Sequence, residues 1–197
     1  MNLKSSSSVA KGLVISDAII SMGAVQIDPA HAEGHYTVQL HDANGNLKWE
    51  DEIENLVVNV GKNLALDTLF AGSAYTVTGP FMGLANANVA SAAATDTMAT
   101  KTTWLESGLA NAPTYTAPRK TVTFSAASAG AKASTGTYTS TFTGAGTVGG
   151  CFIVLGTGAV STLDSTAGVL YSVGAFTGGS KTVASSDTLT VTYTASM

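Results

Sequence analysis

Hydrophobic and polar residues alternate between Tyr36 and His41, which predicts a β-strand with one buried face. The sequence Asp-Ala-Asn-Gly-Asn then interrupts the alternation, and Asn44-Gly45 can supply the positive φ angles of a tight turn. A second strand is predicted from Leu47 to about Val58. The pattern therefore predicts a β-hairpin.

Helical spacing replaces the alternation after this hairpin, because apolar residues now recur four positions apart. Asn59 stands where a helix N-cap is expected, and Gly72 stands where a C-terminal cap is expected. The spacing predicts one short helix near residues 60–71. The apolar pairs are Val60 and Leu64, Ala65 and Leu69, and Leu66 and Phe70.

Alternation with a period of two residues returns further along the chain and continues to its end. Near the end, Leu189, Val191 and Tyr193 share one face while threonines occupy the other. Cys151–Leu155 is continuously apolar, which is typical of a central strand covered on both faces. The predicted strands are Phe81–Leu84, 119–126, 136–144, Cys151–Leu155, 169–176 and 187–195.

The predicted fold class is all-β: an antiparallel β-sandwich with one short helix, in which a long loop over residues 90–103 is anchored by Trp104. We expect a jelly roll, with another β-sandwich as the alternative. Residues 35–197 form this domain.

Residues 1–34 form an N-terminal arm or extension, because Ser5–Ser8 is of low complexity and Asp28-Pro29 separates the arm from the first strand. The arm carries scattered Ile and Val residues, so it either docks on a partner or adds an edge strand.

The charged fraction is only 11%, against about 25% in ordinary soluble domains. A chain this poor in charge is expected to cover part of its surface in an assembly, most simply a homo-oligomer such as a dimer or trimer. Its formal net charge is −4 and its basic residues are scattered, which argues against nucleic acid as a partner. No apolar run has the length of a membrane span, and Asp17 interrupts a would-be signal sequence.

Histidines and acidic residues near the hairpin are the first candidates for a metal site, namely His31, Glu33, His35, His41 and Asp42. In a regular strand His35 and His41 share a face but lie about 20 Å apart, which is too far for joint coordination. Surface histidines are therefore the favoured interpretation. Residues 41–52 also resemble the start of a calcium loop, but the spacing of the oxygen ligands departs from the motif, and a hairpin turn is favoured.

The acidic residues Glu50, Asp51, Glu52 and Glu54 could pair for acid–base chemistry, although a solvated strand face that discourages edge pairing explains them better. The glycine-rich segments 144–150 and 174–180 lack the phosphate-loop motif and precede no predicted helix. Cys151 has apolar neighbours, which indicates an inert buried thiol, and Trp49 and Trp104 are expected to pack in the core. We therefore expect no catalytic, cofactor-binding or metal-binding residue.

Seven segments together resemble a family of small virion proteins of tailed bacteriophages, and the resemblance covers about residues 35–197. They are WEDEIENLVVNVGKNLALDTLFAGSAYTVTGPFMGL, ATDTMA, TWLESG, APRKTVTF, TVGGCFIVLG, VLYSVGAF and DTLTVTYTA. The resemblance implies a non-enzymatic head decoration, or cement, protein with a β-sandwich fold. Such a protein sits on the capsid exterior of the virion and binds the major capsid protein.

Two other functions stay open at this point. The alternative is a tail-fibre-associated virion module that binds host glycan through loops at one end of the sandwich. Hydrolysis of surface polysaccharide is a third. Most aromatic residues here alternate with threonine inside strands and are not in loops, which favours the structural role.

Overall fold

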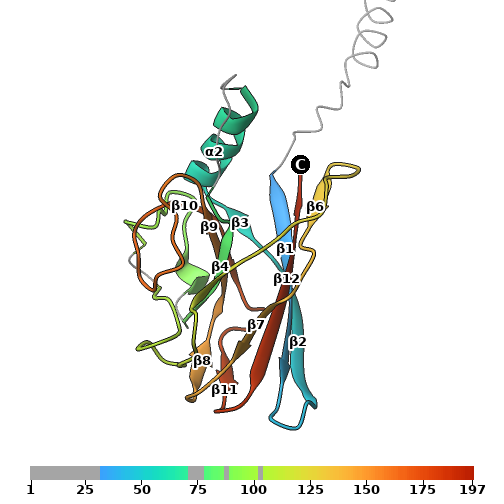
Figure 1. The fold of residues 1–197 in the computed structure, drawn as a ribbon, viewed down its shortest axis with the longest axis vertical. Helices are drawn as coiled ribbons and strands as arrows, with labels where there is room; N and C mark the ends of the chain where they lie inside the picture. The colour runs from blue at the N-terminus through green and yellow to red at the C-terminus, as the bar shows by residue number, and fades with distance from the viewer. Residues whose placement is uncertain (1–31, 71–77, 87–88, 102–103) are drawn as a thin grey trace, which may run out of the picture. The chain divides into compact units, whose positions relative to one another are not determined.

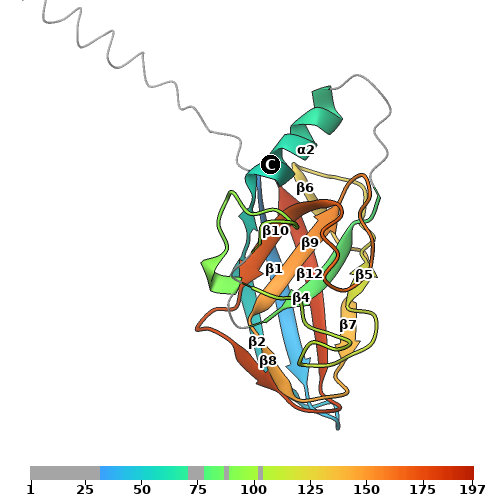
Figure 2. The same cartoon turned by 90° about the vertical axis from the view of Figure 1, so that its left-hand side faces the viewer.

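Two antiparallel β-sheets face each other in the computed structural model, which describes residues 32–70, 78–86, 89–101 and 104–197 (Figures 1 and 2). Within these residues the fold is an all-β sandwich with one short α-helix, as predicted. The jelly-roll connection pattern stays a prediction. The first sheet has the order β2-β1-β12-β6, with β7 also paired to β12, and comprises β1 (Glu33–His41), β2 (Leu47–Glu54), β6 (Ala131–Ala133), β7 (Tyr138–Thr141) and β12 (Thr188–Ser196).

The second sheet has the order β3-β10-β9-β4-β5. Its strands are β3 (Leu56–Val57), β4 (Phe81–Ala85), β5 (Arg119–Thr121), β9 (Gly150–Leu155) and β10 (Val169–Ala175). A separate pair, β8 (Gly146–Val148) and β11 (Lys181–Val183), lies at the lower end of the sandwich in Figure 1, and its residues Val148 and Val183 are part of the core between the sheets. A single turn of 3-10 helix, η1, covers Val89–Ser91.

Strand β1 pairs with β12 along its whole length, from Glu33 opposite Ser196 to His41 opposite Thr188. It therefore begins two residues before the predicted start of the sandwich. Residues 1–31, which include most of the predicted arm, lie outside the described residues.

The predicted β1–β2 hairpin is present, but its turn lies one residue earlier than predicted. The amide of Gly45 donates to the carbonyl of Asp42 at 3.0 Å, so Ala43 and Asn44 form the centre of the turn. Only Gly45, with φ 83°, takes up the left-handed conformation in this turn. A type I turn followed by a glycine bulge explains the difference, because it needs one positive φ angle where the predicted turn needs two.

The strand predicted from Leu47 to Val58 is wrong as a single element. Strand β2 ends at Glu54, and β3 pairs instead with β10 of the opposite sheet, with Val57 opposite Ser172. The amide of Asn55 donates to the carbonyl of Gly34 at 2.9 Å, where the chain crosses from one sheet to the other. This crossing connects the two layers directly.

Helix α2 (Asn59–Phe70) confirms the predicted helix, but not its predicted N-cap. The amides of Gly61 and Lys62 both donate to the carbonyl of Val58 at 3.0 Å. Val58 is therefore the N-cap residue, and Asn59 belongs to the first turn. The predicted cap Gly72 lies outside the described residues.

The first half of α2 packs against β10, and Gly61 makes this approach possible. A Cβ atom on Gly61 would lie 2.5 Å from the carbonyl oxygen of Tyr171, so any larger residue would push the helix off the sheet. Leu64 is buried beside Gly156. The second half of the helix extends beyond the strands (Figures 1 and 2) and leaves three apolar side chains exposed, namely Leu66, Leu69 and Phe70.

Strand β9 separates two hydrophobic cores, which confirms the prediction of a central strand covered on both faces. Cys151 and Ile153 point into the core between the sheets. Phe152 and Val154 point into a second core on the opposite face of the sheet. Both faces of β9 are therefore buried, and for this reason its sequence does not alternate between apolar and polar residues.

Loops and α2 cover the second core (Figure 2). In the described residues no further sheet lies over this face of the second sheet. Trp104 is fully buried there, with its ring centroid 5.1 Å from that of Phe152, which confirms that Trp104 anchors the preceding loop. Trp49 packs edge-to-face on Phe176 at 5.2 Å, again as expected for a packing residue.

Four tyrosines are buried in the core between the sheets: Tyr36, Tyr115, Tyr138 and Tyr193. The Tyr36 hydroxyl lies 2.7 Å from the Ser172 hydroxyl oxygen, and the Tyr193 hydroxyl accepts a hydrogen bond from Asn55 Nδ2 at 2.9 Å. Burial raises the pKa of all four phenols above the ordinary value of 10.0. These side chains are neutral packing residues at physiological pH.

Candidate functional site

His35 and His41 lie on the outer face of β1 at opposite ends of the strand, as the alternation predicted. His35 Nε2 is 3.6 Å from Glu52 Oε1, and Glu33 is exposed at the first position of the strand. His31 lies outside the described residues. No group of three His, Cys, Asp or Glu side chains among the described residues is close enough to hold a metal ion.

The Asp42 carboxylate is used by the hairpin turn itself. Its Oδ1 accepts hydrogen bonds from the amides of Asn44 at 2.8 Å and Asn46 at 2.9 Å, and its Oδ2 accepts one from Asn46 Nδ2 at 2.9 Å. These hydrogen bonds hold the pKa of Asp42 below its ordinary value, and the bond from the Asn46 side chain contributes most. The geometry is that of an Asx turn.

The acidic residues of β2 face solvent along the edge of the first sheet. Glu50, Glu52 and Glu54 are exposed, whereas Asp51 turns the other way and accepts a hydrogen bond from the Thr177 amide at 2.8 Å. This placement agrees with a solvated face that discourages pairing with another strand.

The Cys151 thiol is fully buried in β9, and burial raises its pKa. The glycine-rich segment 144–150 includes β8 and leads into β9, and segment 174–180 forms the end of β10 and a turn. Neither segment leads into a helix.

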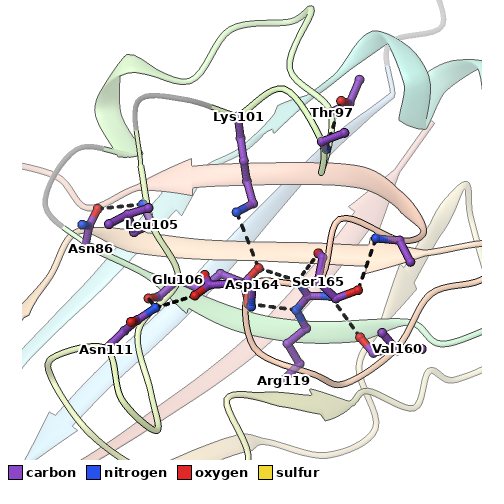
Figure 3. Close-up of polar contacts among 12 residues, drawn as sticks. Asn86, Thr97, Lys101, Leu105, Glu106, Asn111, Arg119, Val160, Asp164 and Ser165 are labelled. Atoms are coloured by element: carbon purple, nitrogen blue, oxygen red, sulfur yellow. Dashed lines mark hydrogen bonds and ion pairs between the residues drawn. The ribbon is translucent and has the colours of Figure 1, made fainter.

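A buried ion cluster lies under the loops that cover the second sheet (Figure 3). We call it the Glu106 cluster, and it comprises Glu106, Arg119, Lys101, Asn111 and Asp164. The Arg119 guanidinium forms a two-pronged ion pair with the Glu106 carboxylate, through Nε at 2.9 Å from Oε2 and through Nη2 to Oε1. The side chains of Arg119 and Glu106 are only 0% and 1% exposed. Such paired geometry is the arrangement in which a buried charge is best compensated.

Other polar groups fill the remaining positions of this ion pair. The amide of Asp164 donates to Glu106 Oε2 at 3.2 Å, and Lys101 Nζ lies 3.7 Å from Glu106 Oε1. Arg119 also donates to the carbonyl of Val160 at 3.0 Å and to that of Ser165 at 2.7 Å. Both oxygens of the carboxylate therefore accept hydrogen bonds from the protein, two at Oε2 and one at Oε1, and Lys101 adds an ion pair at Oε1.

The Glu106 cluster fastens two loops to the start of β5. Asn111 Nδ2 extends the contacts, because it donates to the Glu106 carbonyl at 3.0 Å and to Asp164 Oδ2 at 2.9 Å. The loop containing Glu106 and the loop from Val160 to Ser165 are thereby joined to Arg119 and to each other (Figure 3). In this arrangement the buried carboxylate neutralises and orients two cations and accepts an amide hydrogen bond, which is a role in holding the loops.

Sequence reasoning did not find the Glu106 cluster. Alternation along the strand that begins at Arg119 places Val122 and Phe124 inward, so Arg119 belongs to the face predicted to be solvated. Thr121 and Thr123 of that face are exposed, but Arg119 is buried because distant loops lie over it. The sequence offered one weak signal, because Glu, Lys and Arg are rare in a chain whose charged fraction is 11%. That signal does not indicate which charged residues pair with one another.

An apolar pocket of about 360 Å³ opens to solvent between the two sheets. We call it the end pocket. Its walls include Ile153 and Leu155 of β9, Tyr171 of β10 and Tyr193 of β12, together with Phe124, and Lys132 of β6 lies at its edge. The sequence predicted these residues, except Lys132, as separate strand positions but could not show that they meet.

A second, polar groove of about 390 Å³ lies on the outer face of the first sheet. Its side chains carry hydroxyl, amide and imidazole groups. They are Thr37, Gln39, His41, Thr137, Thr190 and Thr192.

In the part of the chain that the structure describes, no helix has the length and apolar character needed to span a membrane. Comparison with models of known protein families, with characterised proteins and with solved structures finds no match for this chain. The resemblance to phage virion proteins therefore stays a prediction.

Proposed function

We propose that this protein is a head decoration protein of a tailed bacteriophage, which binds the outside of the capsid shell and stabilises contacts between subunits of the major capsid protein. One observation carries the proposal. Glu106, Arg119 and Asp42 are engaged in holding the fold, whereas three of the eight large apolar side chains exposed in the described residues lie together on α2, and the end pocket has mainly apolar walls. This division suits a binding module better than an enzyme.

Helix α2 provides the largest exposed apolar side chains of this region. Leu66, Leu69 and Phe70 are 49%, 67% and 75% exposed and lie three and four positions apart, on neighbouring faces of the helix. An apolar stripe of this kind on a helix that extends beyond its domain supports a contact with another protein.

The end pocket adjoins the base of the same helix. Gly61 of α2 lies against the backbone of Tyr171, and Leu64 lies beside Gly156, which follows Leu155. Tyr171 and Leu155 are walls of the end pocket. The base of the helix thus lies next to the pocket, and we propose that the helix stripe and the pocket together form the capsid-facing surface.

Residues 1–34 are proposed to add to this grip as an arm. Many weak contacts, repeated over a shell, can resist internal pressure through avidity. Most of the arm lies outside the described residues, so its part in the proposal depends on the apolar residues of its sequence. The protein is also proposed to be a homo-oligomer, a dimer or trimer, and sedimentation of the free protein should show a species larger than the monomer.

The decisive experiment is to locate the chain in intact particles by electron cryo-microscopy. We expect density for the sandwich on the outside of the head, in contact with the major capsid protein. Detection on tail fibres alone would overturn the proposal. Deletion of residues 1–31, which leaves the whole of β1 in place, is expected to leave a folded sandwich that binds heads poorly, and full binding by the truncated protein would remove the arm from the mechanism.

The second candidate function is a fibre-associated virion module that binds host glycan. The polar groove beside Thr37 and Thr190 favours it, because hydroxyl and amide side chains can pair with the hydroxyl groups of a sugar. Saturation-transfer NMR with host surface polysaccharide would test this function. Saturable transfer that Gln39→Ala abolishes would support it, and no transfer would exclude this groove as a glycan site.

A further inference from the structure

We propose that the end pocket receives one bulky apolar side chain of a partner protein, and that a carboxylate next to this side chain pairs with Lys132. The inference rests on the proposed function for the existence of a protein partner. It goes further by specifying the chemistry of the contact.

The size and walls of the end pocket suit a single large side chain. Its volume of about 360 Å³ is near the lower end of the range for ligand sites, about 300–1,000 Å³. Phe124 and Tyr193 meet edge-to-face with ring centroids 6.3 Å apart, which gives a preorganised aromatic wall. Ile153 lies deepest in the core, with an exposed fraction of only 1%. An aromatic or branched aliphatic group would find apolar contacts on several sides.

The mainly apolar walls of the end pocket argue against a small polar metabolite. The Tyr193 hydroxyl already accepts a hydrogen bond from Asn55 Nδ2. Small-molecule sites usually direct several polar groups at the ligand, whereas a protein anchor needs mainly a desolvated apolar pocket. This balance favours a side chain of a protein over a free metabolite.

Lys132 supplies the charge selectivity. It is exposed on β6, is the charged residue among those that line the pocket, and makes no ion pair within the described residues. A carboxylate adjacent to the inserted side chain would meet its ammonium group, whereas a lysine in that position would be repelled. The expected occupant is therefore an aromatic or branched residue followed or preceded by Asp or Glu.

The test uses the full-length protein and methyl NMR spectra of Ile153 and Leu155. Three probes are titrated: acetyl-Ala-Trp-Asp-amide, acetyl-Ala-Trp-Lys-amide and acetyl-Ala-Ala-Asp-amide. We expect saturable shifts of both methyl signals with the Trp-Asp peptide, affinity about threefold to fivefold lower with the Trp-Lys peptide, and no saturation with the Ala-Asp peptide. Absence of saturable shifts with the Trp-Asp peptide, or equal affinity for the two Trp peptides, would overturn the inference.

Two variants make the test specific. Lys132→Glu should reverse the preference between the Trp-Asp and Trp-Lys peptides, while Lys62→Glu, at an exposed position of α2, should leave it unchanged. Ala195 of β12 also lines the end pocket, so Ala195→Trp should fill the pocket and abolish binding of both peptides. Lys132→Glu keeps the inference falsifiable if Ala195→Trp fails to fold, because an unchanged preference would remove Lys132 from the contact.

Binding to capsids separates this inference from the proposed function. If Ala195→Trp folds and decorates heads as tightly as the parent protein, the end pocket is not the contact, although decoration itself stands. If the peptides bind as expected but the parent protein does not decorate heads, the decoration function is wrong and the pocket serves another protein partner.

Discussion

Replacing Glu106 by Gln removes one negative charge from the interior while the shape of the side chain is kept. The Arg119 guanidinium is then left fully buried without a counter-ion, and Lys101, whose side chain is 8% exposed, loses its ion pair. The side-chain amide of the new Gln also places an NH2 group where one carboxylate oxygen of Glu106 accepted hydrogen bonds, so this group faces another donor, either Arg119 or the Asp164 amide. Breaking a buried ion pair by removing one partner typically costs about 3–5 kcal/mol. We expect a loss of this size in the free energy of unfolding.

Urea denaturation followed by tryptophan fluorescence measures this loss, because Trp104 is buried beside Lys101 with the ammonium 4.8 Å from its ring centroid. With an m-value of about 2 kcal/mol per molar urea, the midpoint should fall by about 2 M. Glu54→Gln is the matched control, since the same chemical change on the exposed face of β2 should cost less than about 0.5 kcal/mol.

A double-mutant cycle tests the assigned partner. Combining Glu106→Gln with Arg119→Met should cost less than the sum of the two single changes, by about 1–3 kcal/mol, because the second change removes the charge that the first one orphaned. The reasoning would be refuted by a Glu106→Gln protein that unfolds within about 1 kcal/mol of the parent, or by additive effects.

Three further predictions concern the core and one turn. Cys151→Ala should cost about 1 kcal/mol of stability and leave assembly intact, and thiol-reactive dye should label the native protein only as fast as it unfolds. The four buried tyrosines have raised pKa values, so above pH 10 the unfolded chain releases phenolic protons that the folded protein retains. Stability should therefore be unaffected by these groups below pH 10 and should fall above it, by up to about 1.4 kcal/mol per pH unit for each tyrosine, as measured by urea melts across that range. Ala129 has φ 50° in the turn between Ser128 and Ala131, so Ala129→Gly should raise the thermal midpoint, whereas the same change at Ala133 in β6 should lower it.

Strand positions were predictable wherever one face of a strand meets the core and the other meets water. Leu189, Val191 and Tyr193 are buried in β12 as their alternation predicted, and the unbroken apolar sequence of β9 correctly indicated cover on both sides. In these cases the local pattern records the environment of each residue directly.

Features that depend on cover by distant segments were not predictable. Arg119 occupies a nominally outward position of its strand, yet loops more than ten residues away bury it with Glu106. The crossing at Asn55 was hidden because residues on both sides of it have the composition of one continuous strand. The end pocket combines residues of β6 and β12 from one sheet with residues of β9 and β10 from the other, and their meeting depends on the strand order and on the packing of the two sheets.

Loops that cover a sheet in place of helices lack a regular ladder of backbone hydrogen bonds, so side chains must hold them in place. Asn111 does this at low cost, because it joins the Glu106 carbonyl to the Asp164 carboxylate without carrying a charge. Asn111→Ala should therefore cost only about 1–2 kcal/mol for the two lost hydrogen bonds.

The larger effect of Asn111→Ala should be local. Hydrogen exchange of the amides of Asp164 and Ser165, which donate to Glu106 Oε2 and to the carbonyl of Thr162, should accelerate, while the β9 amides keep the protection that global unfolding sets. If the Asp164 amide exchanged at the parent rate, Arg119 alone would suffice to hold the loop. Equal acceleration in β9 would instead mean that the loops and the sheet open as one unit, and that the Glu106 cluster belongs to the core itself.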